Sequence, residues 1–138
     1  MITKTKKSTK KVEKFDYKTI KTFEDACNKL GIDPSKLPDL SMIPEEFRKP
    51  LIATYKLFIV FKAINDGWIA DYSNSSQWKY YPWFRVLSSG FGFSGSGYDF
   101  DYSSAGIGSR LCTDTSEKAL YMAKQFEDLY KDLFLFSE

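Results

Sequence analysis

The chain contains no histidine, and this absence excludes more chemistry than any motif in the sequence adds. Histidine is the commonest general base, the usual partner of a nucleophilic serine or cysteine, and a frequent ligand of zinc and iron. Only two of the 138 residues are cysteines, and Cys27 and Cys112 lie too far apart for a Cys-x-x-Cys motif. We therefore expect two inert buried thiols, no metal site built on histidine or paired cysteines, and no cofactor. Any enzyme would have to rely on carboxylates, lysine, tyrosine or bound Mg²⁺.

Long apolar runs are also absent. A membrane-spanning helix needs roughly 20 consecutive apolar residues, whereas Lys56 and Lys62 interrupt the most apolar stretch, 51–64. The lysine-rich start is not followed by the apolar segment and cleavage site of a secretory signal. We expect a cytoplasmic protein that does not bind a membrane.

Positive charge is concentrated at the N-terminus, although the net charge is only +2. The first fourteen residues hold one acidic residue and six lysines: Lys4, Lys6, Lys7, Lys10, Lys11 and Lys14. Because this segment has little to bury, we expect a basic flexible arm at 1–14 and a single domain at 15–138. The lysines can contact nucleic acid or a neighbouring subunit, but such a run is also typical of a solvated tail.

Helical signals lie on both sides of a central segment of turns and strands. Thr22 and Gly31 are typical helix caps, so we expect a short helix at 23–30. A longer, largely buried helix is expected within 44–67, with a kink or a restart at Pro50. The sequence predicts a third helix after Asp114-Thr-Ser-Glu117, which has the spacing of a capping box with Asp114 as the cap.

Between the helices, four stretches have the alternation or turn signals of short strands: 78–86, 90–94, 98–102 and 106–112. Pro82 is expected to force an edge position or a bulge in the first of them. Together the elements predict an α+β fold. We expect a three- or four-stranded antiparallel sheet packed by the two longer helices, with the short N-terminal helix and the basic arm preceding them.

Aromatic residues cluster around a Gly/Ser-rich hinge at 88–97. Ten lie between positions 78 and 102: Trp78, Tyr80, Tyr81, Trp83, Phe84, Phe91, Phe93, Tyr98, Phe100 and Tyr102. Rings on a sheet either fill a core or remain exposed to bind a flat ligand, and alternation along a strand allows one face to do each. We therefore expect at least two exposed rings.

The same segment provides a candidate binding site for a nucleotide or a single-stranded nucleic acid, since rings stack on bases while cations meet phosphates. We expect stacking from Trp78, Tyr81 and Trp83. Phosphate contacts are expected from Lys79, Arg85 and Arg110. Backbone N–H groups of the glycine-rich loop, at Gly92, Gly95 and Gly97, are expected to donate hydrogen bonds to an anion.

Two other patterns in this segment are weaker. Gly90–Gly95 matches G-x-G-x-x-G, but a strand pattern follows it, whereas a dinucleotide site requires a helix there. Asp99 and Asp101 alternate with aromatic residues and could hold Mg²⁺ together with Asp66 or Asp71. No calcium-loop or similar signature accompanies them, so we interpret them as a solvated strand face and expect no enzyme.

Five segments resemble a family of small proteins encoded by tailed phages of gut Bacteroidota, crAss-like phages among them: 55–68, 73–84, 88–94, 108–112 and 123–134. The resemblance extends from about Thr22 to the C-terminus. It implies a phage protein made in the host bacterial cytoplasm. The family has no assigned activity, so the resemblance transfers no site residue.

These observations lead to two functional hypotheses. The first is a non-enzymatic phage accessory protein that binds a nucleotide or single-stranded nucleic acid, for example to counter a host defence. The alternative is a virion protein, either an auxiliary capsid or an internal component, whose basic arm contacts genome or neighbouring subunits. Phage or host proteins are expected partners, and a homo-oligomer is compatible with both hypotheses.

Overall fold

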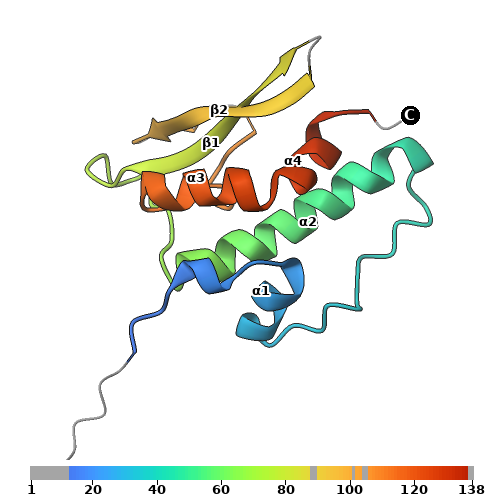
Figure 1. The fold of residues 1–138 in the computed structure, drawn as a ribbon, viewed down its shortest axis with the longest axis horizontal. Helices are drawn as coiled ribbons and strands as arrows, with labels where there is room; N and C mark the ends of the chain where they lie inside the picture. The colour runs from blue at the N-terminus through green and yellow to red at the C-terminus, as the bar shows by residue number, and fades with distance from the viewer. Residues whose placement is uncertain (1–12, 88–89, 101, 104–105, 137–138) are drawn as a thin grey trace, which may run out of the picture.

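The computed structural model describes residues 13–87, 90–100, 102–103 and 106–136. Its elements follow in this order: η1 (Tyr17–Thr19), α1 (Phe23–Leu30), α2 (Glu45–Asn65), β1 (Lys79–Leu87), β2 (Gly90–Asp99), α3 (Ser116–Gln125) and α4 (Glu127–Phe134) (Figure 1). Helices precede and follow the two strands along the chain, which confirms the predicted α+β fold. No helix in these residues is both long and apolar enough to cross a membrane.

The short helix α1 forms where the sequence predicts it, because both of its ends are satisfied locally. The Thr22 hydroxyl accepts a hydrogen bond from the Asp25 N–H at 3.1 Å, and the Asp25 carboxylate accepts one from the Thr22 N–H at 3.1 Å. Gly31 ends the helix in the left-handed region with φ of 69°, which costs glycine little. One face of α1 packs against α2.

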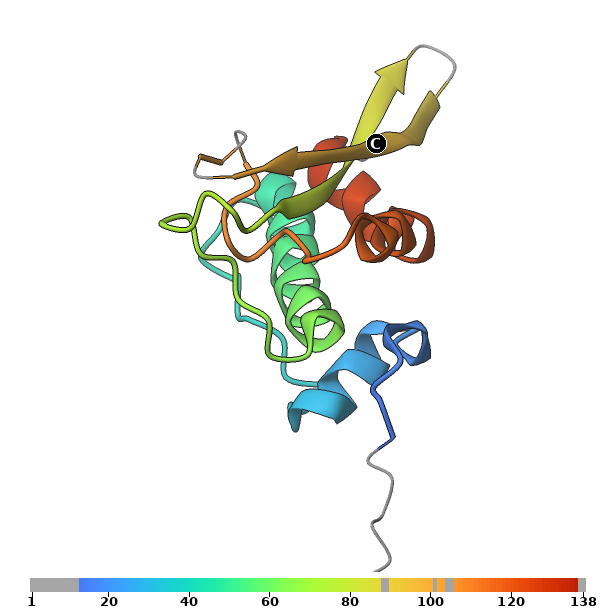
Figure 2. The same ribbon diagram turned by 90° about the vertical axis from the view of Figure 1, so that its left-hand side faces the viewer.

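The central element is α2, which lies between α1 on one side and α3 and α4 on the other (Figure 1). It continues through Pro50 as one helix, so Pro50 does not restart it. Its buried positions surround most of the helix: Ala53, Leu57, Ile59, Val60, Phe61, Ala63, Ile64 and Asn65. The helix ends at Asp66, whose φ is 46°, and the following segment runs back alongside it towards β1 (Figure 2).

The sheet is a long antiparallel hairpin of β1 and β2, which lies over α3 and α4 (Figures 1 and 2). The strand expected at 90–94 and the start of the one expected at 98–102 belong to one strand, which ends at Asp99. A bulge at Ser94 lies between the pairs Trp83/Gly95 and Phe84/Phe93. A third segment joins the sheet at Thr113, which exchanges backbone hydrogen bonds of 2.9 and 2.8 Å with Tyr80.

The C-terminal helix is divided at Phe126 into α3 and α4, whereas the sequence predicted one continuous helix. Its cap also differs from the prediction. The Thr115 hydroxyl accepts from the Lys118 N–H at 3.2 Å, while the Asp114 carboxylate lies 2.9 Å from the Lys118 ammonium. Threonine is a good cap itself, so the helix begins one residue later than predicted.

Candidate functional site

Four rings gather at the open end of the hairpin, and we call them the Trp78 cluster: Trp78, Tyr80, Tyr98 and Phe100. The Trp78 ring centre lies 4.9 Å from that of Tyr98 and 4.5 Å from that of Phe100. Tyr80 and Tyr98 are opposite each other in the strand register, so they share a face. Trp78 is 44% exposed and Tyr98 52% exposed, which confirms the expectation of at least two exposed rings.

On the other face of the hairpin, the β2 glycines make room for rings of β1. A Cβ atom at Gly97 would lie 2.6 Å from Cζ of Tyr81, and one at Gly95 would lie 3.1 Å from Nε1 of Trp83. A ring that lies across a strand glycine stabilises the pair of strands. At Gly92, by contrast, nothing lies within 4 Å of such an atom. Gly95 and Gly97 thus have a packing role that the sequence pattern did not reveal.

A cation, Arg85, lies near the Trp83 ring. Trp83 is 40% exposed, and the Arg85 guanidinium carbon lies 5.7 Å from its ring centre. This distance is within the range of a cation–π interaction. Of the predicted stacking and phosphate-binding residues, Trp83 and Arg85 are therefore brought together at the surface.

Lys79 differs from the prediction, because its side chain is completely buried. Its ammonium group donates to the carbonyl oxygen of Asn74 at 3.0 Å and to that of Phe100. Asp99 occupies the opposite register position and is also buried. A buried ammonium needs hydrogen-bond acceptors, and these two carbonyl oxygens provide them. Lys79 therefore connects the 71–77 loop to the end of β2 and does not present its charge to a phosphate.

The burial of Asp99 also corrects the interpretation of a solvated aspartate face. Asp101, the second carboxylate of the suspected magnesium site, lies outside the described residues. Within the described residues, no three acidic or cysteine side chains gather closely enough to hold a metal ion.

Both cysteines are free and buried, as predicted. Burial raises the pKa of the Cys112 thiol from 9.0 to about 11, and burial likewise raises the pKa of the neighbouring Tyr72 hydroxyl from 10.0 to about 12. Burial also raises the pKa of Cys27. Because the thiolate is the nucleophile, neither cysteine is activated near neutral pH.

Arg110 lies away from the hairpin rings, in a groove of about 510 Å³ that we call the α2 groove. Its lining residues are Ile32, Tyr55, Phe58, Ile59, Lys62, Asn65, Trp68, Ile69, Ser109 and Arg110. The sequence had placed the α2 residues among these in a buried helix. The helical spacing of Tyr55, Phe58 and Lys62 was the available signal that they share one face.

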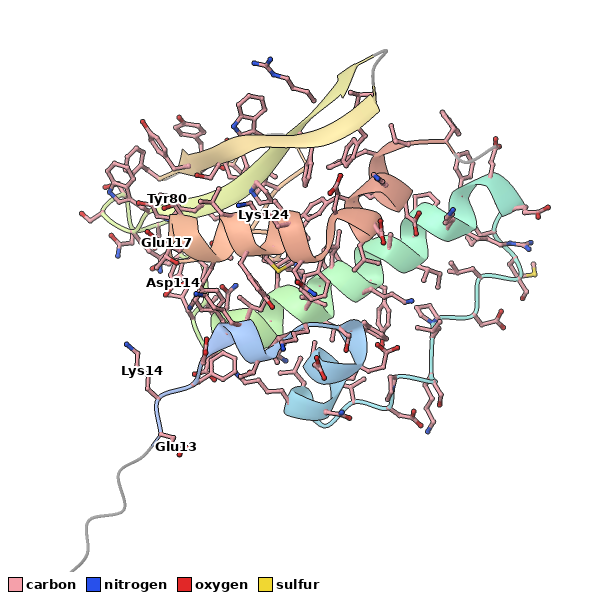
Figure 3. All side chains as sticks on the ribbon, in the orientation of Figure 1. Glu13, Lys14, Tyr80, Asp114, Glu117 and Lys124 are labelled. Atoms are coloured by element: carbon pink, nitrogen blue, oxygen red, sulfur yellow. The ribbon has the colours of Figure 1, made fainter. Side chains whose placement is uncertain are left out.

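The predicted lysine contacts are only partly described. Lys4, Lys6, Lys7, Lys10 and Lys11 lie outside the described residues. Lys14 is exposed, and Figure 3 shows it well away from Tyr80 in the hairpin. The predicted site residues are thus divided among separate parts of the molecule: the Trp78 cluster, the pair of Trp83 and Arg85, the α2 groove and the arm.

No protein family, curated protein or solved structure matched this chain. The functional interpretation therefore depends on the geometry of these surfaces.

Proposed function

We propose that the protein is a non-enzymatic phage accessory protein that binds single-stranded nucleic acid through the exposed rings of its hairpin. The observation that carries this proposal is the exposed Trp78 cluster, in which the Trp78 and Tyr98 rings lie 4.9 Å apart at the surface. Rings placed in this way offer flat apolar area to an unpaired base. Each stacked base contributes about 1–3 kcal/mol of binding free energy.

The charges of the hairpin are compatible with an anionic ligand. Its described strands carry three charged side chains, of which Lys79 and Asp99 are buried and Arg85 is exposed. A phosphate approaching these strands therefore meets an exposed guanidinium and no exposed carboxylate. Arginine also pairs well with phosphate, because its planar donors match the phosphate oxygens.

The spacing of the rings favours a strand of several nucleotides over a single nucleotide. Trp83 lies five residues beyond Trp78, or roughly 17 Å along an extended strand. The two side chains also lie on opposite faces of the hairpin. A single nucleotide can contact one of these sites, whereas a flexible single strand can bend around the narrow hairpin and contact both.

Tryptophan fluorescence tests this proposal directly. Titration with single-stranded oligonucleotides should quench the emission, and added salt should weaken the binding because phosphate contacts release counterions. A double-stranded oligonucleotide of the same sequence should quench less, because its bases are not free to stack on the rings. A flat titration with both DNA and RNA single strands would refute the proposal.

One specific observation favours the virion alternative. Phe47, Phe134 and Phe136 are exposed and line a depression of about 730 Å³ between the start of α2 and the end of α4. Large exposed apolar side chains in one place are typical of a surface covered by a partner. Mass spectrometry of purified phage particles tests this alternative: the protein must be found in them, and its absence would exclude a virion role.

A further inference from the structure

We infer that the α2 groove is a second binding site, separate from the hairpin, for a small planar ligand with a phosphate group, namely a nucleoside monophosphate. The groove shares no residue with the Trp78 cluster or with Trp83 and Arg85. Its volume of about 510 Å³ lies within the range of small-molecule sites, about 300–1,000 Å³. The inference therefore stands or falls independently of the proposed function.

The walls of the groove follow from the way α2 ends. Tyr55, Phe58 and Lys62 lie on one face of the helix because they are three and four residues apart. After the helix, Asp66 and Gly67 have φ values of 46° and 89°. This left-handed turn reverses the chain, so that the following Trp68 forms the next wall.

The rings of the groove can hold a planar ligand. Three of its lining side chains are aromatic: Tyr55, Phe58 and Trp68. Phe58 is partly exposed although it belongs to the most apolar helix of the described chain. A base placed against such rings gains stacking as well as burial.

Two cations of the groove are available to a phosphate. Lys62 and Arg110 are exposed, and neither takes part in an ion pair within the described residues. Other lysines, such as Lys29 and Lys118, lie 2.7 and 2.9 Å from a carboxylate oxygen. None of the residues that line the α2 groove is acidic. The groove therefore combines unneutralised positive charge with aromatic walls.

Asn65 adds an independent sign of a ligand. The residue is only 8% exposed, and its Nδ2 donates to the carbonyl oxygen of Cys112 at 2.9 Å, which fixes the orientation of the amide. Its Oδ1 is buried and accepts no hydrogen bond from the described residues. A buried acceptor without a donor destabilises the free protein. The amino or imino group of a nucleobase supplies the missing donor.

Access to this oxygen requires a side chain to move, since Oδ1 is shielded from solvent in the free protein. The Trp68 side chain is in a position to move and expose this oxygen. It borders both the α2 groove and an adjoining depression, and Asn65 lines both of them. Ligand binding should therefore change the environment of the Trp68 indole, which provides a spectroscopic signal.

The experiment uses the full chain with Trp78→Phe and Trp83→Phe, so that Trp68 is the remaining tryptophan. Circular dichroism first checks that this variant is folded. Titration with AMP, GMP, CMP and UMP should change Trp68 emission, whereas adenosine and inorganic phosphate should each bind more weakly than AMP. Replacing Lys62 and Arg110 with Gln should weaken AMP binding about tenfold or more, because each charge-assisted contact to phosphate is strong.

Lys124→Gln is the matched control, because Lys124 is an exposed lysine of α3 that does not line the groove (Figure 3). It should bind AMP like the parent. The inference is overturned if none of the four nucleotides changes Trp68 emission at millimolar concentration, or if the Lys62/Arg110 variant binds AMP as tightly as the Lys124 variant. Equal binding of inorganic phosphate and AMP would also overturn it, since the groove would then hold an anion without reading a base.

Discussion

Replacing Gly97 with alanine tests whether the rings of β1 can pack across β2 only where β2 has glycine. The added Cβ would lie 2.6 Å from Cζ and 2.7 Å from Cε2 of Tyr81. Carbon atoms prefer separations of about 3.5–4.0 Å, so the ring must move by roughly 1 Å or leave its place. Forced overpacking of this kind costs about 1–3 kcal/mol. We therefore expect Gly97→Ala to lower the free energy of unfolding by that amount.

Two other glycines of the same strand make the comparison quantitative. Gly95→Ala should lower the free energy of unfolding by less than Gly97→Ala does, because its Cβ would lie 3.1 Å from Nε1 of Trp83, a milder overlap. Gly92→Ala should be neutral or slightly stabilising, since nothing lies within 4 Å and alanine restricts the unfolded chain. Urea unfolding followed by circular dichroism gives all three values under one set of conditions.

A double-mutant cycle then identifies the ring responsible. With Tyr81→Ala already present, Gly97→Ala should lose most of its cost, which gives a coupling energy of about 1 kcal/mol or more. The reasoning is refuted if Gly97→Ala costs no more than Gly92→Ala. It is also refuted if the full cost persists without the Tyr81 ring.

Three further predictions concern buried and capping residues. Lys79→Met should destabilise the fold by about 2 kcal/mol, because the carbonyl oxygens of Asn74 and Phe100 lose the buried ammonium that donates to them; a change below 1 kcal/mol in urea unfolding would contradict this. Stability should fall as the pH rises from 9 to 11, since the unfolded Cys112 thiol ionises in that window while the folded one stays protonated. This slope should be shallower in Cys112→Ala, and an unchanged slope would show that other groups cause it. Thr115→Ala should lower the free energy of unfolding by about 1 kcal/mol, because it removes the helix cap. Asp114→Ala should lower it by less, because the ion pair of Asp114 is partly solvated. A larger loss for Asp114→Ala than for Thr115→Ala would place the cap at Asp114.

The sequence predicted best those features that depend on neighbouring residues. Thr22, Asp25 and Gly31 define α1 by themselves, since a cap needs partners only a few residues away. The break at Phe126 was not predicted, because the apolar stripe of the C-terminal helix continues across it. The position of that break depends on packing against the rest of the fold, which a local pattern does not contain.

In the candidate site, too, the sequence did not predict the features that depend on tertiary contacts. Alternation correctly indicated that rings occupy both faces of the hairpin, but it did not reveal which face is covered. Lys79 is buried because the 71–77 loop reaches its ammonium through Asn74, a contact that depends on the path of the loop. The ring contacts of Gly95 and Gly97 depend on the strand register, which the Ser94 bulge shifts. The α2 groove depends on a tertiary contact between α2 and the loop of Arg110.

The most direct test of the central claim is the affinity of a labelled single-stranded oligonucleotide, measured by fluorescence anisotropy for the parent protein and for Trp78→Ala/Tyr98→Ala. Loss of two stacking rings should weaken binding by about 2 kcal/mol or more, roughly thirtyfold. Phe136→Ala, which removes an exposed ring that is not part of the Trp78 cluster, should bind like the parent. Equal affinity of all three proteins, or no binding by the parent, would contradict the account.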